Sequence, residues 1–330
     1  MWPCFWCILI NPEGEPADPP SAYQPAPASG ESVGSGIGRI ICLRHQADEP
    51  AQPSLLPKQV ADRIGEFTCV NSHIGKNMNE TEMEFKSCLH EMLPEIELSD
   101  SQMQQLRIYY ENLIAWNGKI NLTAITEEKD VYVKHFLDSL TLYLCVPRET
   151  FHEGISVIDI GTGAGFPGIP LAIVMPEVSI TLIDALGKRV RFLEDTAQKL
   201  GLENVICIHT RSEDLARNPD HRGKYNLATS RAVANLSTLS EYCIPFLQEG
   251  GSFVAYKSDK TDEEIEDGIR AARILGAEMT NRRDFKLPGT DYHRTLLQFV
   301  KTKPTPGKYP RRAGTPSKEP LGRRKIDMKS

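Results

Sequence analysis

The chain has 330 residues, of which 40% are hydrophobic and 25% are charged, as in an ordinary globular protein. This length allows one or two domains with a full-sized core, and no apolar run reaches the ~20 residues of a membrane helix. Residues 1–10 are apolar but lack the basic leader and cleavage site of a signal peptide. We therefore expect a cytoplasmic protein without a membrane partner.

Charge is distributed unevenly along the chain. The formal net charge of −6 gives no sign of a polyanionic partner, yet residues 301–330 hold ten lysines and arginines against two acidic residues. A basic tail over 302–330 is a candidate contact for a polyanion. The alternative is a disordered, solvated tail.

Residues 1–77 differ from the rest of the sequence. The stretch Pro12–Gly38 is dense in Pro, Gly, Ser and Ala, and no sustained periodicity follows up to Asn77. Such a composition buries too little apolar surface to offset chain entropy, so we expect a disordered extension. It is either a linker or targeting arm, or upstream sequence misassigned to a protein that starts at Met78.

The eight cysteines suggest no disulfide framework and no metal site. Cys4 and Cys7 form a C-x-x-C pair, but no second pair or nearby histidine completes a zinc site. Four further cysteines lie in apolar segments and are expected to be reduced core residues: Cys88, Cys145, Cys207 and Cys243.

Residues 78–150 are predicted to form a helical segment. Glu84–Leu93 is amphipathic, and a second helix is expected from the N-cap candidates at 99–101 to about Trp116, ended by Asn117-Gly118. A third helix is expected over Glu127–Leu144.

From residue 151 to 301 the pattern alternates between strand and helix. Strands are predicted at 155–160, 179–184, 204–209, 225–230, 251–256, 277–285 and 294–301, and helices at 167–175, 188–201, 232–247 and 261–275. The alternation predicts an α/β domain with a seven-stranded, mostly parallel sheet. Because Pro288-Gly289 is too short for a parallel crossover, one of the last two strands is expected to run antiparallel at the edge.

The segment Val157–Gly168 reads as a buried strand, a glycine-rich turn and a helix start. Gly161, Gly163 and Gly165 leave room for a ligand close to the backbone and allow positive φ values. The pattern is G-x-G-x-G, with Phe166 where a dinucleotide fingerprint has its third glycine. It therefore favours S-adenosylmethionine over a dinucleotide.

Ligands of open α/β sheets bind beyond the carboxyl ends of the strands, so polar residues there are candidates for cofactor contacts. Asp184 ends the second strand, 23 residues past Gly161, and could accept hydrogen bonds from a ribose diol, or simply cap the next helix. Ser212 and Glu213 follow the third strand and could contact an adenine edge, or form only a turn.

Two cations follow the fourth and fifth strands. The Arg231 guanidinium could hold a cofactor carboxylate or an RNA phosphate bidentately, and a surface salt bridge is the alternative. Lys257 would add a second positive charge beside the same cleft, so both are candidates for positioning the reactants.

Several linked motifs give residues 78–301 a specific resemblance to a known family. The matching stretches are 116–125 (WNGKINLTAI), 134–140 (KHFLDSL), 159–170 (DIGTGAGFPGIP), Lys188-Arg189 before Phe192-Leu193, and 230–234 (SRAVA). They resemble the bacterial methyltransferases of guanine N7 in small-subunit (16S) ribosomal RNA, once called glucose-inhibited division protein B. The run 309–318 resembles a tail present in some members, and the family has no counterpart to residues 1–77.

The resemblance implies a class I S-adenosylmethionine-dependent methyltransferase with a Rossmann-like fold. It implies cofactor contacts at Gly161, Phe166, Ser212, Glu213 and Arg231, and 16S ribosomal RNA or the small ribosomal subunit as the partner of a monomer. Phosphate contacts are expected from the tail at Arg311, Arg312 and Lys318.

The residues after the fourth strand agree with this acceptor. Ser230-Arg231-Ala232 stands where an exocyclic amine methyltransferase would carry an Asn/Asp-Pro-Pro-aromatic loop, and no cysteine nucleophile occupies the loop. Guanine N7 carries a lone pair and no proton, so neither a base nor a covalent intermediate is needed. Catalysis could depend on in-line positioning in a site that excludes water.

Three further aromatic or titratable residues have two interpretations each. His135 and Asp138 could line the mouth of the pocket or form a structural pair, and Trp116 could stack on an extruded base or pack in the core. Two other functions remain open: a nicotinamide-dependent oxidoreductase, disfavoured by Phe166, and a non-catalytic ribosome-binding protein of the same fold.

Overall fold

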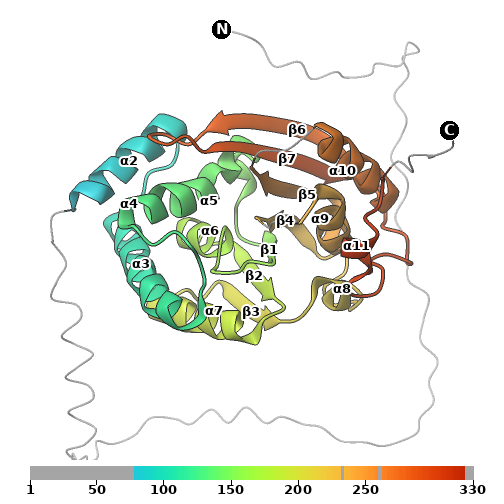
Figure 1. Ribbon diagram of the computed structural model, residues 1–330, viewed down its shortest axis with the longest axis horizontal. Coiled ribbons are helices and arrows are strands. Elements are labelled where there is room, and N and C mark those ends of the chain that lie inside the picture. Colours follow the sequence, from blue (N-terminus) through green and yellow to red (C-terminus); the bar gives the residue numbers. More distant parts are fainter. Residues whose placement is uncertain (1–77, 232–233, 259–261, 324–330) are drawn as a thin grey trace, which may run out of the picture. The chain divides into compact units, whose positions relative to one another are not determined.

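The computed structural model describes residues 78–231, 234–258 and 262–323, and every structural statement below concerns these residues (Figure 1). The expected extension 1–77, with Cys4 and Cys7, lies outside them, as does the tail from residue 324 onward. No helix in the described ranges is long and apolar enough to cross a membrane.

Seven strands form one sheet in the order β3-β2-β1-β4-β5-β7-β6. The strands are β1 (Ser156–Ile160), β2 (Ser179–Asp184), β3 (Val205–His209), β4 (Tyr225–Ser230), β5 (Leu247–Lys257), β6 (Ala277–Lys286) and β7 (His293–Lys301). The first five are parallel, and β7 is antiparallel to both β5 and β6. This confirms the predicted mixed sheet.

The expected position of the antiparallel strand was wrong, because β7 lies second from the edge and β6 forms the edge. The helix α10 (Asp262–Leu275) carries the chain from β5 past one strand position to β6. The short connection at Pro288-Gly289 then returns β7 into the remaining position between them.

Helices cover both faces of the sheet (Figure 1). One core cluster contains Val157 of β1 with side chains of α2 (Glu80–Met92), α3 (Asp100–Ile120), α6 (Gly168–Val174) and α7 (Gly187–Leu200). A second contains Ile158 with side chains of α9 (Leu236–Cys243) and α10. Successive strand residues thus belong to opposite cores, because side chains alternate between the faces of a strand.

The helix α3 continues past Asn117-Gly118, where the sequence predicted its end. It stops at Ile120, and Asn121 takes the left-handed conformation with a φ of 50°. The Asn117 side chain lies within the last turn and accepts hydrogen bonds from the backbone N–H groups of Leu122 and Thr123 at 2.7 and 2.9 Å. The capping asparagine therefore lies four residues later than expected.

The expected third helix is a chain of four short pieces. They are α4 (Glu128–Val131), a π-helical stretch η2 (Tyr132–Leu137), α5 (Asp138–Leu140) and a 3₁₀ turn η3 (Thr141–Leu144). π-helical turns are rare and are frequently found at functional sites. This one contains His135 and directly precedes Asp138.

The chain beyond β7 packs against the domain up to residue 323, so the alternative of a solvated tail is wrong for 302–323. Tyr309 is buried in the second core cluster. Arg222 donates hydrogen bonds to the carbonyl oxygens of Thr305 and Tyr309 at 3.0 and 2.8 Å. A short helix, α11 (Thr315–Lys318), lies beside α9 (Figure 1).

Candidate cofactor-binding site

The glycine turn after β1 contains three glycines with positive φ: Gly161 at 67°, Gly163 at 63° and Gly165 at 91°. A Cβ atom on Gly161 would meet no atom within 4 Å, whereas one on Gly165 would lie 2.7 Å from the Tyr109 hydroxyl. The first glycine therefore faces open space, as expected of a residue that leaves room for a ligand. The third is needed for packing against α3.

The buried carboxylate of Asp159, which sequence reasoning missed, holds the glycine turn in place. Asp159 accepts hydrogen bonds from the Thr162 hydroxyl at 2.6 Å and from the Gly168 N–H at 2.9 Å. Burial raises its pKa to about 6, and these two hydrogen bonds limit the rise. Asp159 thus joins the end of β1 to the start of α6.

Asp184, at the end of β2, faces the turn across the cleft and is almost fully buried. Its carboxylate accepts from the N–H groups of Gly163 and Leu186 at 3.1 and 2.8 Å and from Arg189 at 3.3 Å. A carboxylate has about four acceptor positions, so one remains for a ligand. Asp184 thus fixes the connection between β2 and α7 and keeps the capacity that a ribose hydroxyl requires.

A cavity of about 230 Å³ lies at the ends of β1, β2 and β3. Four of the predicted cofactor residues line it: Gly161, Asp184, Ser212 and Glu213. The remaining lining residues are Ile160, Ile183, Ala185, Thr210, Arg211, Tyr242, Gly314 and Ser317. The volume is below the ~300 Å³ at which drug-sized pockets begin, so it suits the nucleoside part of the cofactor.

Ser212 and Glu213 open the short helix α8 (Ser212–Leu215) and are both buried. The Ser212 hydroxyl donates to the Tyr242 carbonyl at 2.7 Å, and Glu213 accepts from the Gly314 N–H at 3.0 Å. Tyr242 and the residues after β7 are thus part of the site. The sequence analysis did not predict them, because it considered only polar residues that follow the parallel strands. The resemblance of residues 309–318 to a family tail was the one available signal.

Arg231 lies at the end of β4 and is engaged by the π-helical turn. Its Nη1 donates to Asp138 Oδ2 at 2.9 Å, and its Nη2 lies 3.2 Å from His135 Nδ1. The guanidinium also lies over the Phe166 ring, 4.7 Å from the centroid. His135 and Asp138, which were candidates for the pocket mouth, therefore form a structural cluster with Arg231.

Asp138 is fully buried and binds a second arginine that sequence reasoning missed. Arg294, on β7, donates to Asp138 Oδ1 at 2.8 Å. One carboxylate thus connects the helical segment to β7 and to the end of β4. Charge-assisted hydrogen bonds of this kind fix orientation as well as charge.

His135 is neutral in this arrangement. Its Nδ1 lies 3.2 Å from Arg231 Nη2 and 3.1 Å from the Lys134 carbonyl oxygen, and its Nε2 lies 2.9 Å from the Thr123 hydroxyl. Burial lowers the pKa of His135 to about 3, and the Arg231 charge adds to the effect. The ring stacks on Phe166 with centroids 4.4 Å apart.

Phe166 and Lys257 lie deeper than the sequence suggested. Phe166 is buried among Tyr109, Phe136 and His135, and it does not line the nucleoside cavity. Lys257 is also buried, and its Nζ donates to the Ala234 carbonyl at 2.5 Å and lies 3.2 Å from Glu264. Lys257 therefore stabilises the connection after β4.

The three basic tail residues have different surroundings. Arg311 forms a bidentate ion pair with the buried Glu241, with Nη2 2.7 Å from Oε2. Arg312 and Lys318 are exposed. The expectation that all three are available to phosphates therefore needs correction, because the Arg311 charge is neutralised within the protein.

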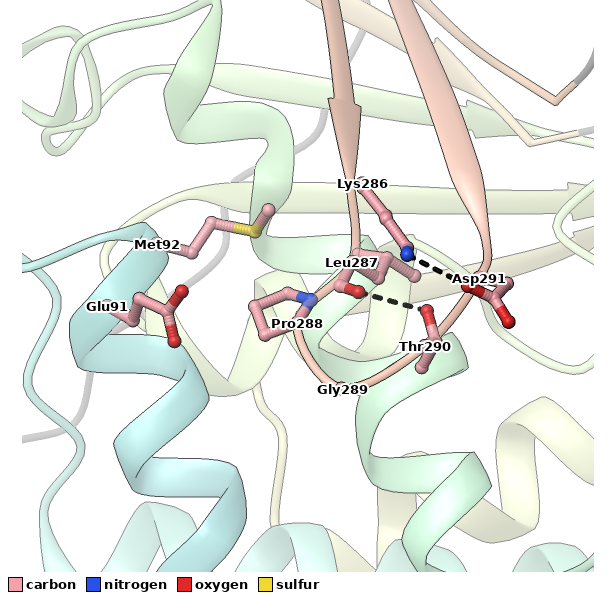
Figure 2. Close-up of a pocket in the computed structure, with 8 residues that line it drawn as sticks. All are labelled: Glu91, Met92, Lys286, Leu287, Pro288, Gly289, Thr290 and Asp291. Atoms are coloured by element: carbon pink, nitrogen blue, oxygen red, sulfur yellow. Dashed lines mark hydrogen bonds and ion pairs between the residues drawn. The ribbon is translucent and has the colours of Figure 1, made fainter.

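A wider depression of about 590 Å³ lies between the end of α2 and the connection from β6 to β7. Figure 2 shows the Lys286–Asp291 ion pair and the Thr290 hydroxyl bonded to the Leu287 carbonyl on this connection. None of the predicted cofactor residues line it, and Lys286, Thr290 and Asp291 are bonded within the connection itself. We therefore place the candidate site at the strand ends.

The strand order and the glycine turn after β1 are those of the class I methyltransferase fold. The family model for rRNA small subunit methyltransferase G matches residues 102–291. The chain belongs to this family, and the alternative of a nicotinamide-dependent oxidoreductase has no support.

The relatives of this chain carry consistent names. Ribosomal RNA small subunit methyltransferase G of Lactobacillus delbrueckii subsp. bulgaricus is 49% identical over 224 residues, covering 68% of this chain and 93% of that protein. The protein of the same name from Alkaliphilus metalliredigens is 46% identical over 241 residues, covering 72% and 100%.

Two solved structures with a similar fold have low sequence identity to this chain. A 16S rRNA (adenine(1408)-N(1))-methyltransferase from Catenulisporales acidiphilia matches with a TM-score of 0.40 at 14% identity, covering 46% of this chain and 87% of that one. M. jannaschii TYW2 in complex with AdoMet matches with a TM-score of 0.39 at 18% identity, covering 50% and 76%.

Proposed function

We propose that this enzyme transfers a methyl group from S-adenosylmethionine to N7 of a guanine in 16S ribosomal RNA. The observation that carries the proposal is the cavity at the ends of β1–β3, with Gly161 facing open space and Asp184 retaining an acceptor position. It occurs in a chain whose relatives are named as methyltransferases of small-subunit ribosomal RNA.

The residues of the cavity fit the cofactor. Asp184 would accept from the ribose hydroxyls, Ser212 and Glu213 would flank the adenine, and Gly161 and Gly163 would let the ligand approach the backbone. When bound, the cofactor supplies a methyl group on a positively charged sulfur.

The polar groups near the end of β4 suit an acceptor that has a lone pair and no proton to lose. His135, with a pKa of about 3, is a poor base at neutral pH, and burial raises the pKa of the Cys243 thiol well above its usual range. Neither group would remove a proton or attack a base. The protein's contribution is then to position N7 and to exclude water.

Arg231 and Lys257 retain a positioning role in this proposal. Arg231 would act through the cluster with Asp138, which fixes the β4 end, and the exposed Arg312 and Lys318 would contact phosphates. A ribosomal substrate places the reaction in the cytoplasm, and we expect a monomer.

The test is methyl transfer by the purified full chain. Small subunits from a strain lacking the modification are incubated with methyl-labelled S-adenosylmethionine, and the nucleosides are identified by mass spectrometry. We expect labelled 7-methylguanosine in 16S RNA. Label in another nucleoside would disprove the assigned acceptor, and cofactor binding without transfer would favour a non-catalytic ribosome-binding protein.

A further inference from the structure

The segment from Thr302 to Arg323 follows the last strand and returns to the cofactor site. It passes along α9 and α10 and contains α11, which lies beside α9 (Figure 1). Two of its residues, Gly314 and Ser317, line the nucleoside cavity together with the residues at the ends of β1 and β2. A part of the chain about 150 residues beyond the glycine turn thus forms a wall of the same cavity.

Two buried carboxylates hold this segment in place. Glu241 on α9 is fully buried, and it accepts from the Arg311 side chain and from the Arg311 backbone N–H at 2.7 Å. Glu213 on α8 accepts from the Gly314 N–H at 3.0 Å. Buried carboxylates are costly unless they are paired or hydrogen-bonded, so these contacts fix both the segment and the carboxylates.

A third contact closes the end of the segment. The Thr238 hydroxyl of α9 donates to the Pro316 carbonyl at 3.0 Å, and Pro316 is itself buried. Ser317 follows directly and is exposed at the cavity rim. Residues 311–316 are therefore anchored on α8 and α9, and the position of Ser317 follows from this anchoring.

We propose that residues 311–317 form the outer wall of the adenosine pocket and set the affinity for ligands that carry an adenosine group. This inference rests on the proposed cofactor site. The Gly314 N–H orients the Glu213 carboxylate at the cavity, and Ser317 limits the space beside it. Arg311 then acts by positioning this wall, and its charge is not available to RNA.

The test is a bulky substitution at the rim. Ser317→Trp places an indole at an exposed position that lines the cavity, so the fold should tolerate it. Glu319→Trp is the matched control, because Glu319 is exposed two residues further on and does not line the cavity. Both variants of the full chain are titrated calorimetrically with S-adenosylmethionine and with S-adenosylhomocysteine.

We expect Ser317→Trp to weaken both ligands at least tenfold and by the same factor, because they share the adenosine group. Glu319→Trp should stay within twofold of the wild type, and both variants should keep the wild-type melting temperature within 2 °C. Unchanged affinity in Ser317→Trp would disprove the proposal that residues 311–317 form a wall of the pocket. It would leave the proposed cofactor site untouched. A wild type that binds neither ligand would overturn both proposals.

A second variant tests the anchoring without filling the cavity. Arg311→Met combined with Glu241→Gln removes both charges at similar volume, so no buried charge is left unpaired. We expect this double variant to bind both ligands with at least threefold lower affinity. An affinity equal to the wild type in a folded double variant would contradict the positioning role of Arg311.

Discussion

The two sides of the strand-end cleft use their polar groups differently. At the ends of β1–β3, Asp184 keeps an acceptor position and Gly161 faces open space. At the end of β4, Arg231 and Arg294 both bind Asp138. The first side keeps a hydrogen-bond acceptor position for a ligand. On the second side, the charged groups are paired within the protein.

The difference teaches that a charged residue at a strand end does not by itself indicate a ligand contact. Spare hydrogen-bonding capacity is the more informative property, because a ligand can only bind to groups that the fold leaves partly unsatisfied. The β1–β3 side should therefore respond to substitution in ligand affinity, and the β4 side in stability. The following predictions test this comparison.

The largest effect is expected from Asp138→Ala. The substitution leaves Arg231 and Arg294 without their shared carboxylate in a mostly buried environment, which should lower the free energy of unfolding by about 3–5 kcal/mol. Urea denaturation of the wild type and the variant measures it.

Asp130→Ala is the control for this prediction. Asp130 forms a partly exposed ion pair with Lys134 on the same segment, and its loss should cost about 1 kcal/mol or less. If the two variants lost equal stability, the cluster around Asp138 would not hold this side of the cleft together.

A smaller effect is expected from His135 as the pH falls. Its folded-state pKa of about 3 lies below the ordinary value of 6.5, so between these values the unfolded state binds a proton that the folded state does not. Stability from this group is therefore lost as the pH drops below 6.5. Asp159 acts in the opposite direction, because its pKa is raised to about 6 and its contribution is lost as the pH rises from 3.8 to 6.

The variant His135→Gln separates these two effects. The difference in unfolding free energy between wild type and variant should change by about 1 kcal/mol per pH unit from pH 6.5 to 4.5, in the direction of a less stable wild type at low pH. A pH-independent difference for His135→Gln would mean that the histidine is not held neutral.

On the ligand side, Gly161→Ala should weaken S-adenosylmethionine binding at least tenfold, which is about 1.4 kcal/mol. The added methyl group would occupy the open space beyond the turn. Gly201→Ala is a matched control, because Gly201 also has a positive φ, of 64°, and open space at its Cβ position.

Both alanine variants carry the same backbone strain, of about 1 kcal/mol, so they should lose similar stability. Only Gly161→Ala should lose affinity in a calorimetric titration. Equal affinities in the two variants would mean that the open space at Gly161 does not face the ligand.

The sequence predicted the sheet well, because strand and helix periods alternate clearly from residue 151. It failed where tertiary contacts decide the backbone. The asparagine side chain at 117 lets α3 continue to Ile120, and the π-helical turn at 132–137 has no local signature in the sequence. The predicted edge strand was wrong because the order of strands depends on which position each connection reaches in the sheet. The lengths of the connections in the sequence do not determine that position.

The strand ends predicted which candidate residues lie together, whereas side-chain pairing between distant segments could not be predicted. Gly161, Asp184, Ser212 and Glu213 follow from the rule that ligands lie beyond strand ends, and they do line one cavity. No rule applied to a single sequence reveals that Arg294 binds Asp138, 156 positions away. For the same reason, the sequence alone does not show that residues 302–323 return to the cavity.

The smallest effect is expected from Trp116→Phe, which decides between core packing and base stacking. The Trp116 Nε1–H donates to Asp195 at 2.8 Å, and the ring packs edge-on against Phe192. Its loss should cost about 1 kcal/mol of stability and leave the KM for small subunits unchanged. A raised KM at unchanged stability would instead show that Trp116 contacts RNA and would extend the ligand-recognising side of the cleft to α3.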